Sequence, residues 1–185
     1  MAEVWARKRE IRKRNDSTAN LYDERYTEEQ KAKYSAALKH SSFTGITNLL
    51  DAGCGTGLFV EYLGATDLEI FGVDISIECL KIASAKFRNR KNVFLVCGDT
   101  DYMPFSEGTF DSGVAFTLIQ SLPEPSRTLK EIARVLKGGA QLIISILRRD
   151  MGLDIFEALL RPFNLKLVEV VESENLKDYI AVCKG

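Results

Sequence analysis

The sequence predicts an α/β fold built on a doubly wound, mostly parallel β-sheet. Short apolar runs alternate with amphipathic helical segments through most of the chain, which is the pattern of successive βαβ units. The last two apolar runs, at 165–171 and 178–183, are separated only by the polar link 172–177. A parallel crossover needs about a dozen residues or more, so this link predicts an antiparallel hairpin. We therefore expect a parallel sheet that ends in one antiparallel pair.

The individual elements follow from the same pattern. Ser76 is the expected N-cap of the second core helix, which continues to about Phe87, because its hydroxyl can accept a hydrogen bond from the first turn. The expected strands cover residues 46–51, 69–74, 92–97, 110–116, 141–147, 165–171 and 178–183, and the other core helices cover residues 58–65, 126–136 and 150–161.

Composition indicates one globular domain over residues 1–185. The chain is 45% hydrophobic and 28% charged, which suits a single core. We expect a helical arm over residues 1–45 and an α/β core over residues 46–185. The net charge of −1 argues against non-specific nucleic-acid binding by the whole surface. Scattered cysteines, a single histidine and the lack of an apolar span or secretory signal predict no metal site, no membrane anchor and a cytoplasmic location.

The first 40 residues carry two features. The segment 7–14 is rich in Lys and Arg. It is either a solvated terminal helix or a basic arm that contacts RNA phosphates. Further on, Thr27 and Gln30 fit a capping box, which predicts a helix from Glu28 to about His40.

A glycine-rich turn follows the first strand. Gly53, Gly55 and Gly57 alternate with small residues, and an apolar helical segment begins directly afterwards. Glycine permits a left-handed backbone and a close approach to a ligand, and the helix N-terminus offers unpaired N–H groups. Asp74 lies 21 positions after Gly53, at the end of the next strand, close to the spacing of an acid that holds a ribose. This context favours an adenosine-like cofactor over a purely structural turn.

Five short motifs accompany the successive strands. They are Asp-Ala-Gly-Cys-Gly-Thr-Gly (51–57), Gly-Val-Asp-Ile-Ser (72–76), Gly-Asp-Thr-Asp-Tyr-Met-Pro-Phe (98–105), Phe-Asp-Ser-Gly-Val-Ala-Phe (110–116) and Arg-Val-Leu-Lys-Gly-Gly (134–139). Together they resemble the motifs of the class I S-adenosylmethionine-dependent methyltransferases. The resemblance covers about residues 45–147 by motif. It implies a seven-stranded Rossmann-like sheet of order 3-2-1-4-5-7-6, S-adenosylmethionine as cofactor, and an arm that folds over the cofactor as a lid.

The resemblance also implies roles for individual residues. Gly53, Gly55 and Gly57 are expected to let the backbone approach the cofactor. Asp51 is expected at the amino-acid end of the cofactor, and Asp74 at the ribose hydroxyls.

The rest of the expected site follows the next two strands. Ile75 should flank the adenine, while Asp99 and Thr100 should meet its amino group and ring edge. For Asp99 the alternative is an N-cap of the turn 100–104. Phe116 and Thr117 should line the mouth at the methyl group.

Two tyrosines of the arm complete the expected site. Tyr22 and Tyr26 form a Tyr-Asp-x-x-Tyr element that resembles the lid over the methionine end of the cofactor. The alternative is aromatic packing of an N-terminal helix on the core.

The methyl acceptor and any catalytic residue are left open. The segment after the fourth strand lacks the Pro-Pro signature of amide and exocyclic amino methylation, and only Glu124 offers a weak candidate base. Without an inserted substrate domain, the acceptor is either a small molecule or an RNA or translation protein reached with a partner subunit. The alternative function is a catalytically silent cofactor-binding subunit.

The third strand predicts a partner surface. As an edge strand, 92–97 would carry an unbroken apolar sequence, whereas exposed edges usually carry charge or proline. One hypothesis is that a small zinc-binding activator subunit adds a strand here, as such proteins do with the methyltransferases that this chain resembles. The alternative is that helices cover both faces of the sheet and the edge is merely short.

Overall fold

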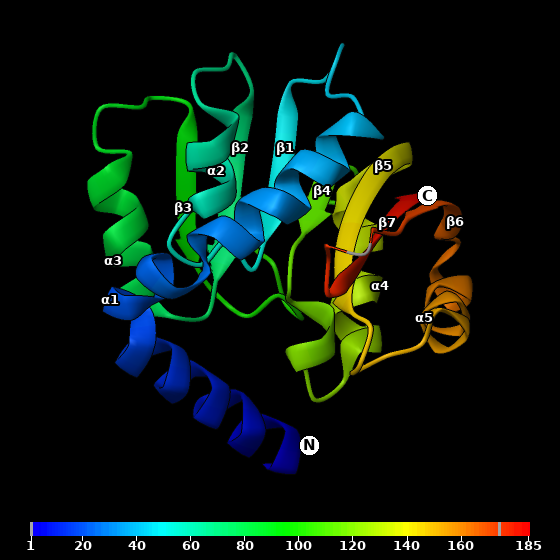
Figure 1. The fold of residues 1–185 in the computed structure, drawn as a ribbon, viewed down its shortest axis with the longest axis horizontal. Helices are drawn as coiled ribbons and strands as arrows, with labels where there is room; N and C mark the ends of the chain where they lie inside the picture. Colours follow the sequence, from blue (N-terminus) through cyan, green and yellow to red (C-terminus); the bar gives the residue numbers. More distant parts are fainter. Residues whose placement is uncertain (1, 174) are drawn as a thin grey trace.

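The core of the protein is a seven-stranded sheet of order β3-β2-β1-β4-β5-β7-β6 (Figure 1). The computed structural model describes residues 2–173 and 175–185. The strands are β1 (Asn48–Ala52), β2 (Glu69–Asp74), β3 (Val93–Cys97), β4 (Phe110–Ala115), β5 (Leu136–Leu147), β6 (Lys166–Val171) and β7 (Asp178–Lys184). All seven expected strands are present in the predicted order, so the predicted fold is confirmed.

Strand direction separates the sheet into two parts. β3, β2, β1, β4 and β5 pair in parallel, whereas β7 is antiparallel to both β5 and β6. The predicted terminal hairpin is therefore confirmed. In the parallel part, Ala52 pairs with Val73 and Asp74 pairs with Cys97. This register brings the carboxyl ends of β1, β2 and β3 to one edge of the sheet.

Helices cover both faces of the sheet. α1 (Ala2–Lys39), α2 (Leu58–Leu63) and α3 (Ile77–Lys86) lie on one face, and α4 (Pro125–Val135) and α5 (Leu153–Leu160) lie on the other (Figure 1). Neighbouring residues of β1 show the alternation: Leu49 belongs to the apolar cluster beneath the first group, and Leu50 to the cluster beneath the second. Two short 3₁₀ turns, η1 (Ile119–Ser121) and η2 (Arg161–Phe163), complete the elements.

The N-terminal arm differs from the prediction. The expected helix start at Glu28 is wrong, because α1 is continuous from Ala2 to Lys39 and the Thr27 hydroxyl donates to the Asp23 carbonyl within it. α1 bends part-way along its length (Figure 1). Ser17 and Thr18 both donate to the Arg14 carbonyl, and such side-chain bonds to the helix backbone bend helices. We call residues 2–15 the outer half of α1 and residues 19–39 its inner half.

Two further details bear on the site and its setting. Ser76 is the N-cap of α3, as predicted, and its hydroxyl accepts from the Cys79 N–H. Among the helices of the described residues, none combines the length and the hydropathy needed to cross a membrane.

Candidate functional site

The turn between β1 and α2 is fastened to the end of β2. The N–H groups of Gly53 and Cys54 both donate to the Val73 carbonyl, at 2.8 and 3.1 Å. Gly57 has φ of 80°, and a Cβ there would lie 2.4 Å from the Phe87 ring. Glycine is therefore required at Gly57 by both backbone conformation and packing against α3. The result is a rigid turn at the carboxyl edge of the sheet.

Asp74 connects this turn to the next helix. Its Oδ2 accepts from the Gly55 N–H and its Oδ1 from the Ser76 N–H, each at 2.8 Å. Burial raises the pKa of Asp74, although these backbone bonds oppose the shift. The carboxyl group is thus held in one orientation at the end of β2.

Two cavities lie on either side of Gly53, which lines both. The Asp74 cavity is lined by Lys8, Ile11, Asn15, Gly53, Asp74, Ile75, Gly98, Asp99, Thr100, Leu118, Ser121 and Leu122. The Asp51 cavity is lined by Tyr22, Gln30, Tyr34, Asp51, Gly53, Cys54, Gly55, Thr56, Leu58, Phe59 and Phe116. α1 supplies lining residues to both cavities, so it covers this edge of the sheet.

Asp51 is a buried acid without a full set of partners. It is 2% exposed, and its Oδ2 has no hydrogen-bond partner among the described residues. Burial, and then the charge of Asp74, raise the pKa of Asp51 to about 7. Gln30 lines the same cavity, and its Oε1 is likewise buried and without a partner among the residues described. Two unpaired acceptors in one cavity favour a ligand that carries a donor, above all a cation.

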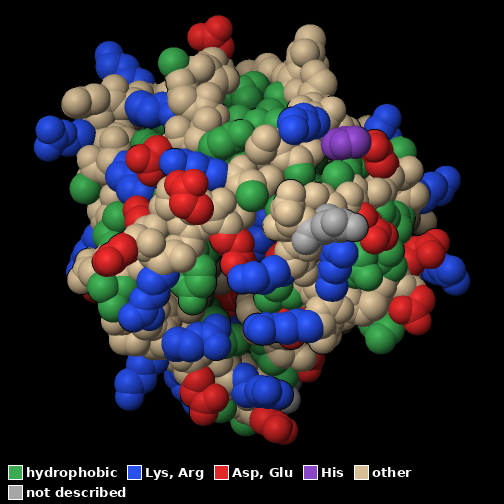
Figure 2. Space-filling view, viewed as in Figure 1, with side chains coloured by type: hydrophobic (Ala, Val, Ile, Leu, Met, Phe, Trp, Pro, Cys, Tyr) green, Lys and Arg blue, Asp and Glu red, His purple; other side chains and the backbone are tan. Residues whose placement is uncertain are grey.

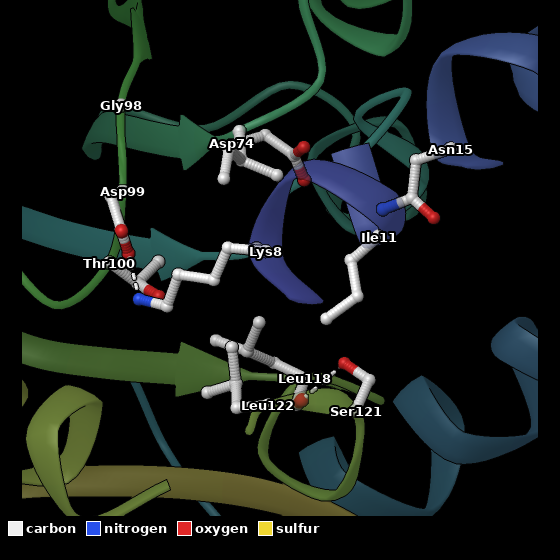
Figure 3. A pocket seen from close by; sticks show the side chains of 12 residues that line it. Lys8, Ile11, Asn15, Asp74, Gly98, Asp99, Thr100, Leu118, Ser121 and Leu122 are labelled. Carbon is white, nitrogen blue, oxygen red and sulfur yellow. Dashed lines mark hydrogen bonds and ion pairs between the residues drawn. The ribbon is translucent and has the colours of Figure 1, made fainter. Parts of the chain in front are cut away.

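Lys8 is the main site feature that sequence reasoning missed. Its Nζ lies 2.6 Å from Asp99 Oδ1 and 2.5 Å from Asp101 Oδ2, and the residue is 3% exposed. Its side chain crosses the Asp74 cavity from α1, between Asp74 and the leucines Leu118 and Leu122 (Figure 3).

Asp99 serves the turn after β3 and still retains one unused oxygen. Oδ1 accepts from the Asp101 N–H at 3.0 Å, which is the local capping role considered as the alternative. Oδ2 is buried and has no partner among the described residues. The capping bond therefore leaves the carboxylate able to accept from a ligand.

Comparison with known proteins decides the family. The model of the methyltransferase domain matches residues 50–144, which is more than half of the chain. The chain belongs to the class I S-adenosylmethionine-dependent methyltransferases. The match begins in β1 and ends in β5, so it includes the glycine turn and the ends of β2 and β3.

The relatives of this methyltransferase have different acceptors in their names. Malonyl-[acyl-carrier protein] O-methyltransferase of Marinomonas sp. is 28% identical over 82% of this chain and 56% of its own length. Demethylmenaquinone methyltransferase of Staphylococcus saprophyticus is 28% identical over 77% of this chain and 64% of its own. The chain spans about half the length of the first curated relatives it matches.

Solved structures share the fold of the methyltransferase. A SAM-dependent methyltransferase from Aquifex aeolicus aligns over 91% of this chain and 97% of its own, with a TM-score of 0.77 and 20% identity. A putative methyltransferase in complex with the Haloferax volcanii Trm112 activator aligns over 94% and 96%, with a TM-score of 0.79 and 17% identity. The [4+2]-cyclase SpnF aligns over 83% and 80%, with a TM-score of 0.75 and 18% identity.

Most of the predicted site residues of the methyltransferase line the two cavities. The Asp74 cavity contains Gly53, Asp74, Ile75, Asp99 and Thr100, and the Asp51 cavity contains Tyr22, Asp51, Gly53, Gly55 and Phe116.

Three predicted residues are not among those that line the cavities. Tyr26 is 41% exposed and packs on Tyr22 with ring centroids 5.0 Å apart. Gly57 contacts Phe87. Thr117 lies next to Phe116 but turns toward α1 and adopts φ of 57°, which is unusual for a residue with a branched side chain.

A buried polar cluster holds Thr117 in place. Its N–H donates to Ser145 Oγ at 2.8 Å, and its Oγ1 accepts from Gln30 Nε2 at 3.1 Å and Lys33 Nζ at 3.2 Å. Lys33 is fully buried and also pairs with Asp178 and Glu29, at 3.1 and 3.2 Å. Sequence reasoning did not find this cluster, because it joins one turn of α1 to Thr117, Ser145 and Asp178, which lie far along the chain.

Proposed function

We propose that this methyltransferase binds S-adenosylmethionine across the two cavities and transfers its methyl group to an acceptor. The observation that carries the proposal is the unpaired, buried Oδ2 of Asp51 beside the glycine turn. A buried acid without a partner is costly, and the ammonium of the cofactor's amino-acid end would neutralise it. When bound, the cofactor supplies an activated methyl group on a sulfonium.

The Asp74 cavity suits the nucleoside end of the same cofactor. Asp74 would accept from the ribose hydroxyls, since a carboxylate oxygen that holds one N–H can accept a further bond. The unpaired Oδ2 of Asp99 would accept from the adenine amino group. Ile75, Leu118 and Leu122 line the space in between and would contact the faces of the ring. Gly53, which lines both cavities, would lie along the middle of the cofactor.

The protein's contribution to the transfer is mainly positioning. Methyl transfer is an in-line displacement, so the acceptor atom must be held in line with the methyl group at near-contact distance. Phe116 lines the Asp51 cavity, and the polar cluster holds the adjacent Thr117 in a strained conformation. Strain of this kind persists where surrounding contacts fix it, often at functional sites. We assign no general base.

Binding and turnover separate the proposed function from its alternatives. Calorimetry should show S-adenosylhomocysteine binding and no binding of NAD, which a nicotinamide oxidoreductase with a similar glycine-rich turn would bind. Incubation with methyl-labelled S-adenosylmethionine and fractionated cell extract should label one fraction. Binding without labelling of any small-molecule, RNA or protein fraction would support the silent cofactor-binding subunit. Absence of binding would overturn the proposal.

The acceptor is proposed only by class. The named acceptors of the curated relatives are diverse, so these relatives select none for this chain. We propose either a small molecule or an RNA or translation protein that is reached with a partner subunit. The labelled fraction distinguishes these two cases.

The exposed edge at β3 supports the proposal of a partner subunit. β3 ends the sheet, Phe94 is 40% exposed, and Cys97 is exposed as well. The Phe94 ring stacks on Phe71 at 4.8 Å and so is held at the surface. We propose that a small zinc-binding activator of the Trm112 kind pairs with this edge. Mixing the two should raise the melting temperature, and the Phe94→Lys variant should lose that gain.

We propose an RNA contact through residues 7–14. Arg7, Arg9, Arg12 and Lys13 are exposed, whereas Lys8 is buried in the Asp74 cavity. Figure 2 shows Lys and Arg side chains gathered on the part of this face where the outer half of α1 lies. Salt-sensitive binding of unfractionated tRNA, weakened by Arg12→Ala, would support the contact.

We also propose that the protein acts in the cytoplasm.

A further inference from the structure

The Lys8 side chain lies where the proposed adenine would lie. It enters the Asp74 cavity from the outer half of α1 and runs between Asp74 and the pair Leu118 and Leu122 (Figure 3). Its Nζ ends at Asp99 Oδ1, 2.6 Å away. The aliphatic part of the Lys8 side chain therefore fills the apolar part of the cavity, and its ammonium pairs with Asp99 at the end of the cavity.

The Lys8 side chain and an adenine ring cannot occupy the same part of the cavity at once. Asp99 Oδ2 is buried and without a partner in the part of the chain that the structure describes. Asp99 lines the cavity that Lys8 crosses, so an adenine that approaches Asp99 through this cavity meets the Lys8 side chain. Binding of the nucleoside therefore requires that Lys8 withdraw from the cavity.

The outer half of α1 is held loosely enough to move. Among the described residues of α1 before Ala19, Lys8 alone is buried. The remaining contacts of this half are few: Trp5 stacks on Tyr102 with centroids 6.1 Å apart, Ile11 and Asn15 line the cavity, and the Asn15 carbonyl accepts from Cys79 Sγ at 4.0 Å. A segment that buries no apolar side chain has little to lose on opening.

The inner half of α1 gives the movement a fixed base. It buries Gln30, Lys33, Tyr34 and Ala37, whereas the bend near Ser17 and Thr18 separates it from the outer half. The outer half can therefore move without releasing the inner half from the sheet.

We infer that Lys8 is an internal competitor for the adenine end of the cofactor, and that the outer half of α1 must open before the nucleoside binds. This inference rests on the proposed function. Lys8 thereby sets the apparent affinity of the site, because the intrinsic affinity is multiplied by the fraction of molecules in which the cavity is open.

The first test measures S-adenosylhomocysteine affinity by calorimetry for Lys8→Met and Lys13→Met. Methionine keeps the length of the lysine stem but removes the charge. Lys13 is exposed on the same half of α1 and serves as the matched control. Lys8→Met should bind about tenfold more tightly, the gain expected when a closed state that dominates about ten to one is lost. Lys13→Met should stay within about twofold of the unmodified protein. Unchanged or weaker binding by Lys8→Met would overturn the inference.

The second test follows the outer half of α1 itself. Trp5 is the only tryptophan of the chain and lies on the outer half of α1. In Lys8→Met, its emission should change and the amides of residues 2–15 should exchange faster, while residues 19–39 keep their protection. Addition of S-adenosylhomocysteine to the unmodified protein should also move Trp5 off Tyr102 and change its emission. If Lys8→Met leaves exchange over 2–15 unchanged, the ion pair does not hold this half closed and the inference is wrong.

The two tests separate this inference from the proposed function. If neither the unmodified protein nor Lys8→Met binds S-adenosylhomocysteine, the proposed function fails, whatever the exchange experiment shows. If both bind equally and exchange over 2–15 does not respond to Lys8→Met, only the inference about Lys8 fails.

Discussion

The two buried lysines of α1 both form ion pairs with acids of the core, but the two pairs have different roles. Lys8 pairs with Asp99 and Asp101, and Lys33 pairs with Asp178 and Glu29. Lys33 lies on a half of the helix with several buried neighbours, whereas Lys8 is the only buried residue of its half among those described. Asp99 lines a cavity, whereas Asp178 is the first residue of β7 and is fully buried against Lys33 of α1. The Lys33 pair therefore adds to a half of α1 that is already packed on the sheet. The Lys8 pair is the main contact that holds the outer half in place.

The largest effect is expected at Lys33. Lys33→Met leaves Asp178 buried without its cation, and removal of one partner of a buried pair costs about 3–5 kcal/mol. Urea unfolding should show a loss of this size in the free energy of unfolding. Lys31→Met is the matched control, because Lys31 is exposed in the same half and should change stability by less than about 0.5 kcal/mol. A loss below about 1 kcal/mol for Lys33→Met would show that the inner half is not fixed by this pair.

Asp51 extends the comparison to a buried acid for which the described residues supply no lysine. Its expected cation is the ammonium of the ligand. Asp51→Asn should weaken S-adenosylhomocysteine binding by about 10- to 100-fold, which corresponds to about 1.5–3 kcal/mol for a charged hydrogen bond. Calorimetry measures the loss, and thermal unfolding should show no matching loss of stability. Unchanged affinity would place the amino-acid end elsewhere.

The pH dependence follows from the same acid. Burial raises the pKa of Asp51 to about 7, and only the ionised carboxylate attracts an ammonium. S-adenosylhomocysteine affinity should therefore fall by about tenfold per pH unit below pH 7 and level off above it.

The stability of the free protein should depend on the same group. Because the folded pKa of Asp51 exceeds the unfolded value near 3.9, the Asp51 contribution to the stability of the free protein is present below about pH 4. It is lost as pH rises to 7. Asp51→Asn should flatten the pH profiles of both affinity and stability. A pH dependence that persists in this variant would show that another group causes it.

The smallest effect is expected for the stability of Lys8→Met. The pair is buried, but the outer half of α1 can open and let water reach Asp99 and Asp101. The cost is then limited to the free energy of that opening, and we expect about 1 kcal/mol or less. Urea unfolding beside Lys33→Met measures the difference between the two lysines. Equal losses for both variants would show that the two halves are held alike.

Much of the sheet could be predicted from sequence, because buried parallel strands read as short apolar runs. β2 has the expected limits, Glu69–Asp74, and the terminal hairpin follows from the short link before Asp178. α1 could not be predicted as one helix. Its polar stretch near Ser17 and Thr18 has weak helix propensity, and contacts far along the chain hold its two halves.

The site could be predicted only where it follows strand ends. Asp51, Asp74 and Asp99 come directly at or after the ends of β1, β2 and β3, so their grouping follows from the topology. Lys8 and Lys33 could not be found this way, because lysines in a charged helix are usually exposed. Asp99 lies 91 positions from Lys8, and nothing in the sequence between them links the two.

The fold alone does not determine the reaction. A [4+2]-cyclase aligns with this chain as well as the methyltransferases do. Family membership and the residues that line the two cavities, rather than the fold, are what favour methyl transfer.

A crystal structure with S-adenosylhomocysteine bound is the decisive measurement. We expect the ammonium within hydrogen-bond distance of Asp51, the ribose hydroxyls on Asp74, and the adenine between Ile75 and Leu118 with Lys8 withdrawn from Asp99. A nucleoside bound away from Asp51 and Asp74 would contradict the proposed function. Adenine seated in the cavity with the Lys8–Asp99 pair intact would contradict the competition between them.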